Sequence, residues 1–285
     1  MHNFFISAIN VFSKIRDEII ILFNTNTSSH LTYCKFANAQ LHFYSERCQS
    51  ANLMIQNEKL WDAEILMRAA VECATRIIFV SIAEEPERSA RLYEYLVELA
   101  EINDISHSEK AKKFIEGKEG EDSIIMRGLV LNDAEENELR TKWPKNKRKV
   151  LIQKWSFTAM VGEISKFNKN GLNLHAYNNF LHGYGLSSHL IHADQTAIGL
   201  IWDRNHREQE EYIALTNAHM ARLLTDSVGL LAMCWKSIAY ALDTRDLNPE
   251  VMNSIVSLLN ASDIFHSNFA TTQTEFYEKY KPNDN

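Results

Sequence analysis

The sequence contains few of the two residues that shape turns. Its 285 residues include only 9 glycines and 4 prolines. A β-rich protein of this length needs many turns, and glycine and proline are among the residues that turns use most. The shortage therefore favours helices. The 45% of hydrophobic residues and 24% of charged residues are typical of a globular protein and exclude global disorder.

Cysteine is also rare, and no pair of cysteines has the spacing of a metal-binding or redox motif. The four cysteines are Cys34, Cys48, Cys73 and Cys234. Three of them lie inside apolar helical patterns, which predicts buried, reduced thiols. Reduced thiols indicate a reducing compartment, so we expect the protein in the cytoplasm.

No apolar run is long enough to span a membrane. Charged residues interrupt the hydrophobic N-terminal segment 1–23 at Lys14, Arg16, Asp17 and Glu18. No basic region precedes this segment and no small-residue cleavage site follows it, so we expect no signal peptide. Its apolar residues recur at helical spacing. We therefore expect an amphipathic helix that docks on the body of the protein or on another subunit, in preference to a membrane surface.

Helical patterns separated by short polar stretches occupy the rest of the chain. The expected helices span about 31–56, 59–83, 87–101, 156–168, 174–192 and 203–243. Asn170-Gly171 is expected to stop the helix before it, Pro249 to start a further helix, and Ser262-Asp263 to cap the last one. The prediction is an all-α antiparallel helical bundle with short polar insertions. We divide it into an N-terminal helix and loop (1–30), a helical bundle domain (31–245) and C-terminal helices (246–285).

A line of charges runs along the otherwise apolar helix between Trp61 and Phe79. Its members follow one another at four-residue steps and so share one side of the helix: Glu64, Arg68, Glu72 and Arg76. A helix this apolar is usually central in its bundle, so the charges would face a neighbouring helix or a cleft, where unpaired charge is costly. Two interpretations stay open. The line is either part of a functional site or a structural ladder of Glu64–Arg68 and Glu72–Arg76 pairs.

A second segment, from Tyr177 to Asp194, is rich in histidine. Ser188 and His192 are four residues apart on one helical face. Histidine is the side chain best suited to exchange protons near neutral pH. The spacing is not that of a His-Glu-x-x-His zinc site and serine is a poor structural ligand, so we predict no metal and no other cofactor. The alternative is that these histidines are hydrogen-bonded packing residues.

These two segments carry a family resemblance. The stretch Arg-Ala-Ala-Val-Glu at Arg68–Glu72, followed much later by Tyr177–Phe180 and by Ser188 and His192, resembles a bacterial family of helical domains, domain of unknown function 5677. That family is similar to the HEPN group of α-helical domains. The resemblance covers about residues 31–242 and implies that the Arg-x-x-x-Glu helix and the Ser–His helix face each other. It also implies a metal-independent ribonuclease in phage defence or a toxin–antitoxin system, usually dimeric.

The sequence departs from the HEPN pattern at its catalytic motif. HEPN ribonucleases carry an arginine five to seven positions before the histidine, whereas Gly185, Leu186 and Ser187 hold those places before His192. The resemblance therefore requires an arginine from another helix, and Arg68 is the candidate. In this hypothesis His192 exchanges the proton, Arg68 holds the phosphate, Glu72 orients Arg68, and Ser188 binds the phosphate or positions the imidazole.

A basic segment follows an acidic run in the middle of the chain. Arg140–Lys154 carries seven basic residues and no acidic one. Basic side chains interleaved with tryptophans hold a single-stranded backbone and stack its bases. The predicted RNA-binding residues are Lys145, Lys147, Arg148, Lys149, Trp143 and Trp155. The alternative is a solvated loop neutralised by the preceding acids, and the net charge of −7 argues against a general nucleic-acid coat protein.

Aromatic stripes near both termini predict self-association. They exceed what a terminal helix needs for solubility, so we expect a homodimer or larger assembly, although docking within one chain would also use them. The aromatic residues expected in the contact are Phe4, Phe5, Phe12, Phe265, Phe269 and Phe276. The functional hypothesis is a HEPN-like effector acting on RNA, with a protein partner encoded nearby. Its rival is a non-catalytic helical sensor, immunity partner or scaffold.

Overall fold

The computed structural model describes residues 1–117, 120, 122–244 and 247–279, and the chain forms two compact units. One unit contains residues 1–82 and 161–285, and the other contains residues 83–160. The second unit is therefore an insertion into the first. The division differs from the predicted one, because the N-terminal helix belongs to the larger unit and the insertion lies inside the segment predicted to be a single bundle domain.

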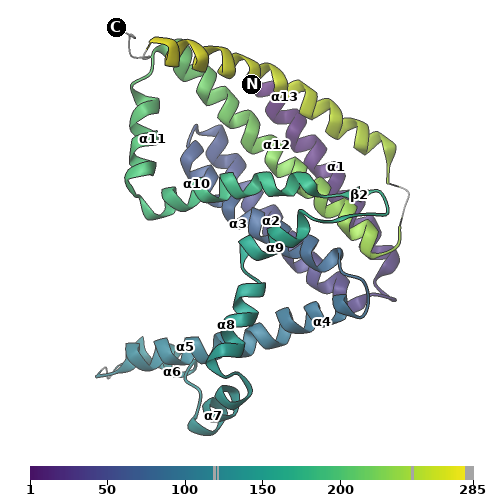
Figure 1. Cartoon of the computed structure of the whole chain (residues 1–285), viewed down its shortest axis with the longest axis vertical. Coiled ribbons are helices and arrows are strands. Elements are labelled where there is room, and N and C mark those ends of the chain that lie inside the picture. Colours follow the sequence, from purple (N-terminus) through teal and green to yellow (C-terminus); the bar gives the residue numbers. More distant parts are fainter. Residues whose placement is uncertain (118–119, 121, 245–246, 280–285) are drawn as a thin grey trace. The chain divides into compact units, whose positions relative to one another are not determined.

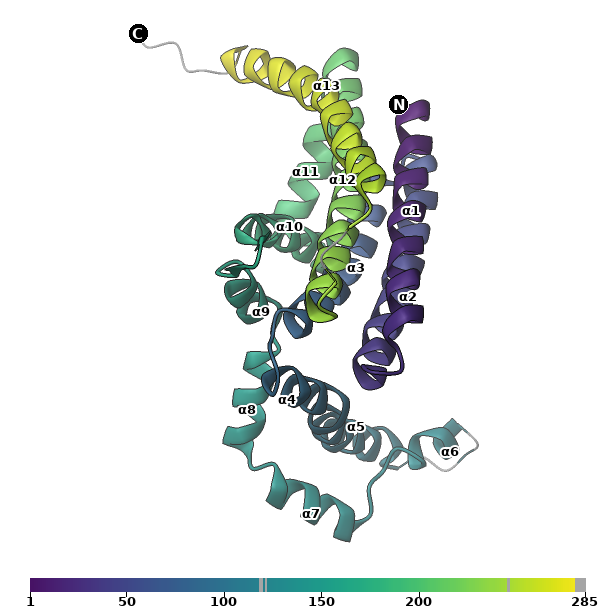
Figure 2. The same ribbon diagram turned by 90° about the vertical axis from the view of Figure 1, so that its right-hand side faces the viewer.

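Long helices build the larger unit (Figures 1 and 2). They are α1 (His2–Asn26), α2 (Leu31–Gln56), α3 (Leu60–Ser81), α12 (Gln209–Ala241) and α13 (Pro249–Lys279). α2 lies along α3, and α12 contacts α1, α3 and α13. α3 and α12 are consequently the central pair, which is the place that the apolar composition of α3 predicted. The all-α fold class is confirmed.

Shorter elements complete this unit beside α3 and α12. They are β1 (Asn168–Lys169), β2 (Leu172–Asn173), η2 (His175–Asn179), α10 (Phe180–His192) and α11 (Gln195–Asn205). Asn170 and Gly171 join β1 to β2 with φ of 50° and 80°, the left-handed backbone that a tight Asn-Gly hairpin turn requires. The prediction that this pair stops a helix was wrong, because α9 (Phe157–Ile164) ends before it.

The predicted helix boundaries agree with the structure where an apolar pattern is long, and they are wrong where two helices follow each other closely. The predicted 31–56 helix matches α2, whereas the predicted 203–243 helix merges the end of α11 with α12. α13 is one continuous helix, and Ser262 bonds to the Leu259 carbonyl inside it instead of starting a new helix. A serine or threonine hydroxyl satisfied by its own helix turn loses its capping role.

The N-terminal helix docks within the chain. Phe4 packs edge-on against Phe265 with ring centroids 5.2 Å apart, and Phe12 stacks on Tyr44 at 6.1 Å. Phe5 is also buried and Phe269 is half-buried, while the side chain of Phe276 lies outside the described residues. The predicted oligomer contacts at Phe4, Phe5 and Phe12 are thus used internally. Over the described ranges, no helix is both long and apolar enough to cross a membrane.

The inserted unit is a set of shorter helices. They are α4 (Glu87–Tyr93), the π-helical turn η1 (Glu94–Glu98), α5 (Leu99–Ile115), α6 (Asp122–Arg127), α7 (Asp133–Lys142) and α8 (Lys145–Lys154). Asn132 and Glu135 form a reciprocal capping box at the start of α7. All four cysteines, which lie in the larger unit, are buried and unbonded to one another, as the sequence predicted.

The docking of α1 predicts that two isoleucines of this helix differ greatly in their contribution to stability. Ile19 is 0% exposed and Ile21 is 57% exposed. Ile19→Ala should lower the free energy of unfolding by about 2–5 kcal/mol, because it leaves a cavity in the core. Ile21→Ala, on the same helix, should change it by less than about 0.5 kcal/mol. Urea unfolding of both variants measures this, and equal midpoints would contradict the docked position of α1.

Candidate functional site

On α3, Arg68 and Glu72 contact Tyr184 of α10, and Arg76 joins this group through Glu72. Arg68 Nη2 donates to the Tyr184 hydroxyl at 2.9 Å, and that hydroxyl donates to Glu72 Oε1 at 2.9 Å. The Arg68 guanidinium also lies 4.1 Å from the centre of the Tyr184 ring. Arg76 donates to Glu72 Oε2 at 3.1 Å. Tyr184 therefore joins the acid and the arginine that the sequence analysis placed together.

One nitrogen in this group of side chains makes no hydrogen bond within the described residues. Arg68 Nη1 is buried and has no hydrogen-bond partner in the part of the chain that the structure describes, although the Arg68 side chain as a whole is 21% exposed. Buried polar atoms in native structures nearly always have a partner, which is sometimes water or a ligand. Arg68 thus keeps one unused donor at the edge of the protein surface. Burial, and then the hydrogen bond to Glu72, raise the pKa of Tyr184, so its hydroxyl stays protonated and available as a donor.

α3 and α10 run antiparallel at this contact. Thr75 on α3 shares a hydrogen bond of 2.9 Å with Tyr177 on η2, and Arg68, seven residues earlier on α3, bonds to Tyr184 on α10. The chain from η2 into α10 therefore runs opposite to α3. The sequence analysis missed Tyr184. A signal that could have found it is its spacing of seven residues from Tyr177 within the single helix expected over 174–192.

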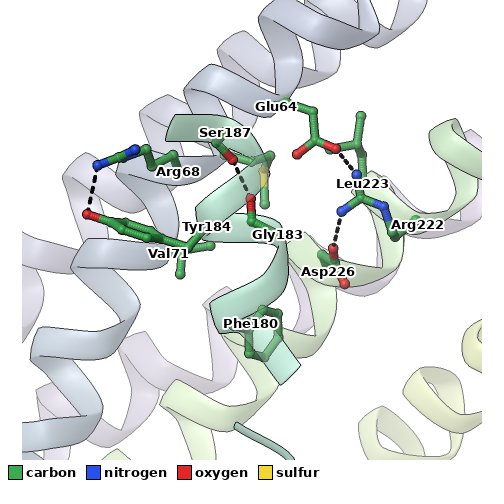
Figure 3. A pocket seen from close by; sticks show the side chains of 11 residues that line it. Glu64, Arg68, Val71, Phe180, Gly183, Tyr184, Ser187, Arg222, Leu223 and Asp226 are labelled. Atoms are coloured by element: carbon green, nitrogen blue, oxygen red, sulfur yellow. Dashed lines mark hydrogen bonds and ion pairs between the residues drawn. The ribbon is translucent and has the colours of Figure 1, made fainter. Parts of the chain in front are cut away.

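A small pocket lies beside Arg68, between α3, α10 and α12 (Figure 3). Its cavity volume is about 30 Å³, room for about two water molecules. Arg68 and Tyr184 form one wall, and Glu64, Arg222 and Asp226 form the other. The remaining lining side chains are mostly apolar, among them Met67, Val71, Phe180 and Leu223. A pocket of this size holds a small polar group, not a whole nucleotide.

Glu64 is withdrawn from the charge line on α3 and belongs to a buried network. Its side chain is 3% exposed and its Oε1 accepts hydrogen bonds from His219 Nε2 at 2.8 Å and from Arg222. Arg222 continues to Asp226 at 3.1 Å. The predicted Glu64–Arg68 pair therefore does not form, whereas the predicted Glu72–Arg76 pair does. The ladder interpretation is correct for only half of the line.

The other ring nitrogen of His219 reaches α11. Arg204 Nη2 lies 2.7 Å from His219 Nδ1, and the Arg204 guanidinium stacks 4.1 Å from the centre of the Trp61 ring. A guanidinium only donates, so Nδ1 accepts and Nε2 carries the proton that goes to Glu64. Burial and the neighbouring Arg204 lower the pKa of His219 to about 3, and burial lowers the pKa of Arg204 to about 10. His219 is consequently a neutral connector.

Ser188 and His192 lie on α10 away from the pocket. His192 is exposed and Ser188 is half-exposed, and neither makes a side-chain hydrogen bond or ion pair within the part of the chain that the structure describes. His192 is eight residues past Tyr184, which is about 12 Å along the helix axis and about 80° around it. The structure brings Arg68 and Glu72 to α10, as the sequence predicted, but to Tyr184 instead of His192. A shared reaction centre of Arg68, Glu72, Ser188 and His192 stays a prediction.

A second histidine on α10 does have a carboxylate partner. His189 Nδ1 lies 2.6 Å from Asp194 Oδ2, and Asp194 also caps α11 by accepting from the backbone nitrogens of Thr196 and Ala197. These contacts lower the pKa of Asp194, the His189 hydrogen bond most of all. The pair joins the end of α10 to the start of α11, so its observed role is structural.

The basic segment of the inserted unit is α8, and its tryptophans are not stacking platforms. Trp143 and Trp155 are 7% and 8% exposed, and their indole nitrogens donate to Glu101 and Glu94 at 2.7 and 2.9 Å. The expectation that they stack bases is wrong, because their rings are buried in the unit's own core. Lys145, Lys147 and Lys149 are exposed and Arg148 is half-buried.

No metal site is found among the described residues, since no three histidine, cysteine, aspartate or glutamate side chains converge there. Comparison of the chain with protein-family models, with curated proteins and with solved structures gives no match.

The buried network predicts a distinctive pH dependence of stability. The unfolded state binds a proton at His219 near pH 6.5, whereas the folded state does so only near pH 3. The neutral His219 therefore contributes fully to the free energy of unfolding above pH 6.5. This contribution is lost as the pH falls from 6.5 toward 3, by up to about 1.4 kcal/mol per pH unit. His219→Gln keeps an acceptor for Arg204 and a donor for Glu64 but does not titrate.

The variant should accordingly flatten the acid side of the stability profile. Urea unfolding of parent and His219→Gln between pH 7 and pH 4 measures the difference, and His182→Gln, an exposed histidine on α10, is the matched control. Parallel profiles for parent and His219→Gln would show that His219 is not held neutral in the folded protein.

Proposed function

We propose that the protein is a HEPN-like helical effector that acts on RNA, with Arg68 as the group that binds a phosphate. The observation that carries the proposal is Nη1 of Arg68, which has no hydrogen-bond partner among the described residues and belongs to a side chain that lines a small pocket. Guanidinium groups are the preferred protein ligands of phosphate, because their nitrogens match phosphate oxygens in geometry and charge. Nη2 is already held by Tyr184, so the unused nitrogen is presented in a fixed orientation.

The charges around Arg68 support an anionic ligand. Glu72 accepts from Tyr184 through Oε1 and from Arg76 through Oε2. Its Oε1 also lies 3.8 Å from Arg68 Nε. Glu64 is satisfied by His219 and Arg222. The acids of this region are thus occupied, whereas Arg68 retains a donor. A phosphate oxygen at Nη1 would satisfy that donor and remove the cost of burying it alone.

The proposed reaction is cleavage of RNA without a metal ion. His192 takes the proton of a ribose 2′-hydroxyl, the 2′-oxygen attacks the adjacent phosphorus, and the 5′-oxygen leaves with the proton that the imidazolium returns. Arg68 stabilises the charge that develops on the phosphorane. This role requires Arg68 to extend along α10 toward His192, and Ser188 lies between the two on that helix.

The wider setting of the proposal follows the family resemblance. It comprises a cytoplasmic protein, self-association, a partner encoded nearby and a role in phage defence or a toxin–antitoxin system. The four buried, unbonded cysteines fit a reducing compartment. Light scattering tests self-association, and a monomer at high micromolar concentration would remove that part of the proposal.

One observation favours a second candidate, a non-catalytic helical module. Among the described residues no side chain orients His192, and a catalytic histidine is usually held by a second group. In this alternative the Arg68 pocket binds a phosphate or another anion as a sensor or an interaction site, and no bond is broken. The two candidates differ in what His192 does.

Variants of His192 and Arg68 separate the candidates. His192→Gln should slow RNA cleavage by about 100-fold or more, because it removes a proton-transfer group while keeping much of the volume. Arg68→Lys keeps the charge and the contact with the Tyr184 ring but loses the second nitrogen, and should weaken phosphate binding by about tenfold. Cleavage should persist in EDTA. The readouts are cleavage of a labelled RNA and growth arrest on expression.

His182→Gln is the control, because His182 is an exposed histidine on the same helix. Circular dichroism and melting temperature confirm that each variant is folded. If folded His192→Gln protein cleaves RNA and arrests growth as the parent does, catalysis by this site is excluded. A parallel loss of anion binding in Arg68→Lys would then support the non-catalytic module.

A further inference from the structure

The first half of α8 carries positive charge that the protein does not neutralise. Lys145, Lys147 and Lys149, which we term the α8 lysine cluster, are exposed and form no ion pair or hydrogen bond through their side chains in the described residues. Other basic side chains of the same unit do have carboxylate partners: Lys112 and Arg140 bind Glu136, Lys142 binds Glu101, and Lys154 binds Glu94. The cluster is therefore distinct from the paired charges around it.

Two Lys-Trp pairs fix α8 in place from both ends. Lys142 and Trp143 bind Glu101 at 2.8 and 2.7 Å, and Lys154 and Trp155 bind Glu94 at 2.8 and 2.9 Å. Leu151 is buried between these attachments. The hydrogen bonds from Lys142 and Trp143 lower the pKa of Glu101 and keep it ionised, so this attachment persists at neutral pH. The lysine cluster is consequently held on a fixed support.

The arrangement of the cluster is unfavourable for the isolated helix. Its three lysines and Arg148 fall within the first five residues of α8, where the positive end of the helix dipole repels cations. Lys145 and Lys149 are also four residues apart, and like charges at that spacing repel. Arg148 adds a buried Nε that has no hydrogen-bond partner. A polyanion bound here would relieve both repulsions.

We propose that the α8 lysine cluster binds the phosphate backbone of RNA without reading its bases. The inference rests on the proposed action on RNA and assigns a second contact for the same substrate, in the inserted unit. Lysines that contact phosphates position a nucleic acid but carry no sequence information. Because the indoles of Trp143 and Trp155 are buried, they add no base stacking.

The exposed surface of α8 fits RNA better than a lipid surface. Membrane-surface helices insert a continuous stripe of large apolar residues that commonly includes tryptophan or phenylalanine. α8 exposes only two aliphatic side chains, Val150 and Ile152, and its neighbouring tryptophans are directed inward. A lipid surface is therefore the competing outcome that the experiment has to separate.

The test combines Lys145→Glu, Lys147→Glu and Lys149→Glu in the full chain and measures binding of a short oligouridylate by fluorescence anisotropy at several salt concentrations. Affinity should fall about tenfold or more. The slope of log affinity against log salt should shrink by about 2, since each lost phosphate contact contributes about 0.7 for a single strand. Glutamates near the start of a helix are favourable, so the variant should stay folded.

A scattered variant is the matched control. Lys35→Glu, Lys110→Glu and Lys166→Glu change the net charge by the same amount at exposed lysines that are far apart in the sequence. This variant should keep most of the affinity and the salt slope. An abasic ribose-phosphate strand should bind the parent nearly as well as oligouridylate does.

Three results would overturn the proposal: equal loss in the clustered and scattered variants, failure of the abasic strand to bind, or cluster-dependent binding to phosphatidylserine vesicles without binding to RNA. The proposed function fails separately. If Arg68 and His192 variants leave RNA cleavage unchanged while the cluster governs affinity, the backbone contact stands and catalysis does not. If cleavage needs His192 but the clustered variant binds RNA as the scattered variant does, catalysis stands and the backbone contact at α8 does not.

Discussion

A buried carboxylate, Glu64, is the constraint on which the larger unit depends. It sits on α3 and binds His219 and Arg222 on α12, and His219 in turn binds Arg204 on α11. An ionised group in this position is tolerated only when it is fully paired, so the three helices have one arrangement that satisfies it. Packing of apolar side chains stabilises the contact between α3 and α12, and the pairing of Glu64 determines the register of the two helices.

The same network shapes the candidate site. Arg222 is held between Glu64 and Asp226, and all three residues line the pocket. On the Arg68 side, Glu72 accepts from Tyr184 and Arg76 and its Oε1 lies 3.8 Å from Arg68 Nε. Tyr184 holds Nη2 of Arg68, which leaves Nη1 without a hydrogen-bond partner among the described residues.

The sequence predicted the helices well but not the side-chain contacts between them. The four-residue steps from Glu64 to Arg76 correctly indicated one central helix, because that spacing is a property of a single segment. The contacts that give those charges their roles lie 155 residues away for Glu64–His219 and 116 for Arg68–Tyr184. No periodicity carries such information. The ladder interpretation paired Glu64 with Arg68, and the roles of Tyr184, His219 and Arg222 were missed.

The tryptophans of the inserted unit show why residue type alone cannot distinguish a binding surface from a core. Trp143 and Trp155 each follow a lysine, which is the composition of a stacking groove, yet both bury their rings and donate to glutamates on the neighbouring helix. Glu94 lies on η1 and Glu101 on α5, and these two consecutive elements receive both Lys-Trp pairs. That attachment uses the aromatic surface inside the unit, whereas the lysines of the first half of α8 stay exposed. The positions of the tryptophans therefore follow from their partners in the fold and not from residue type.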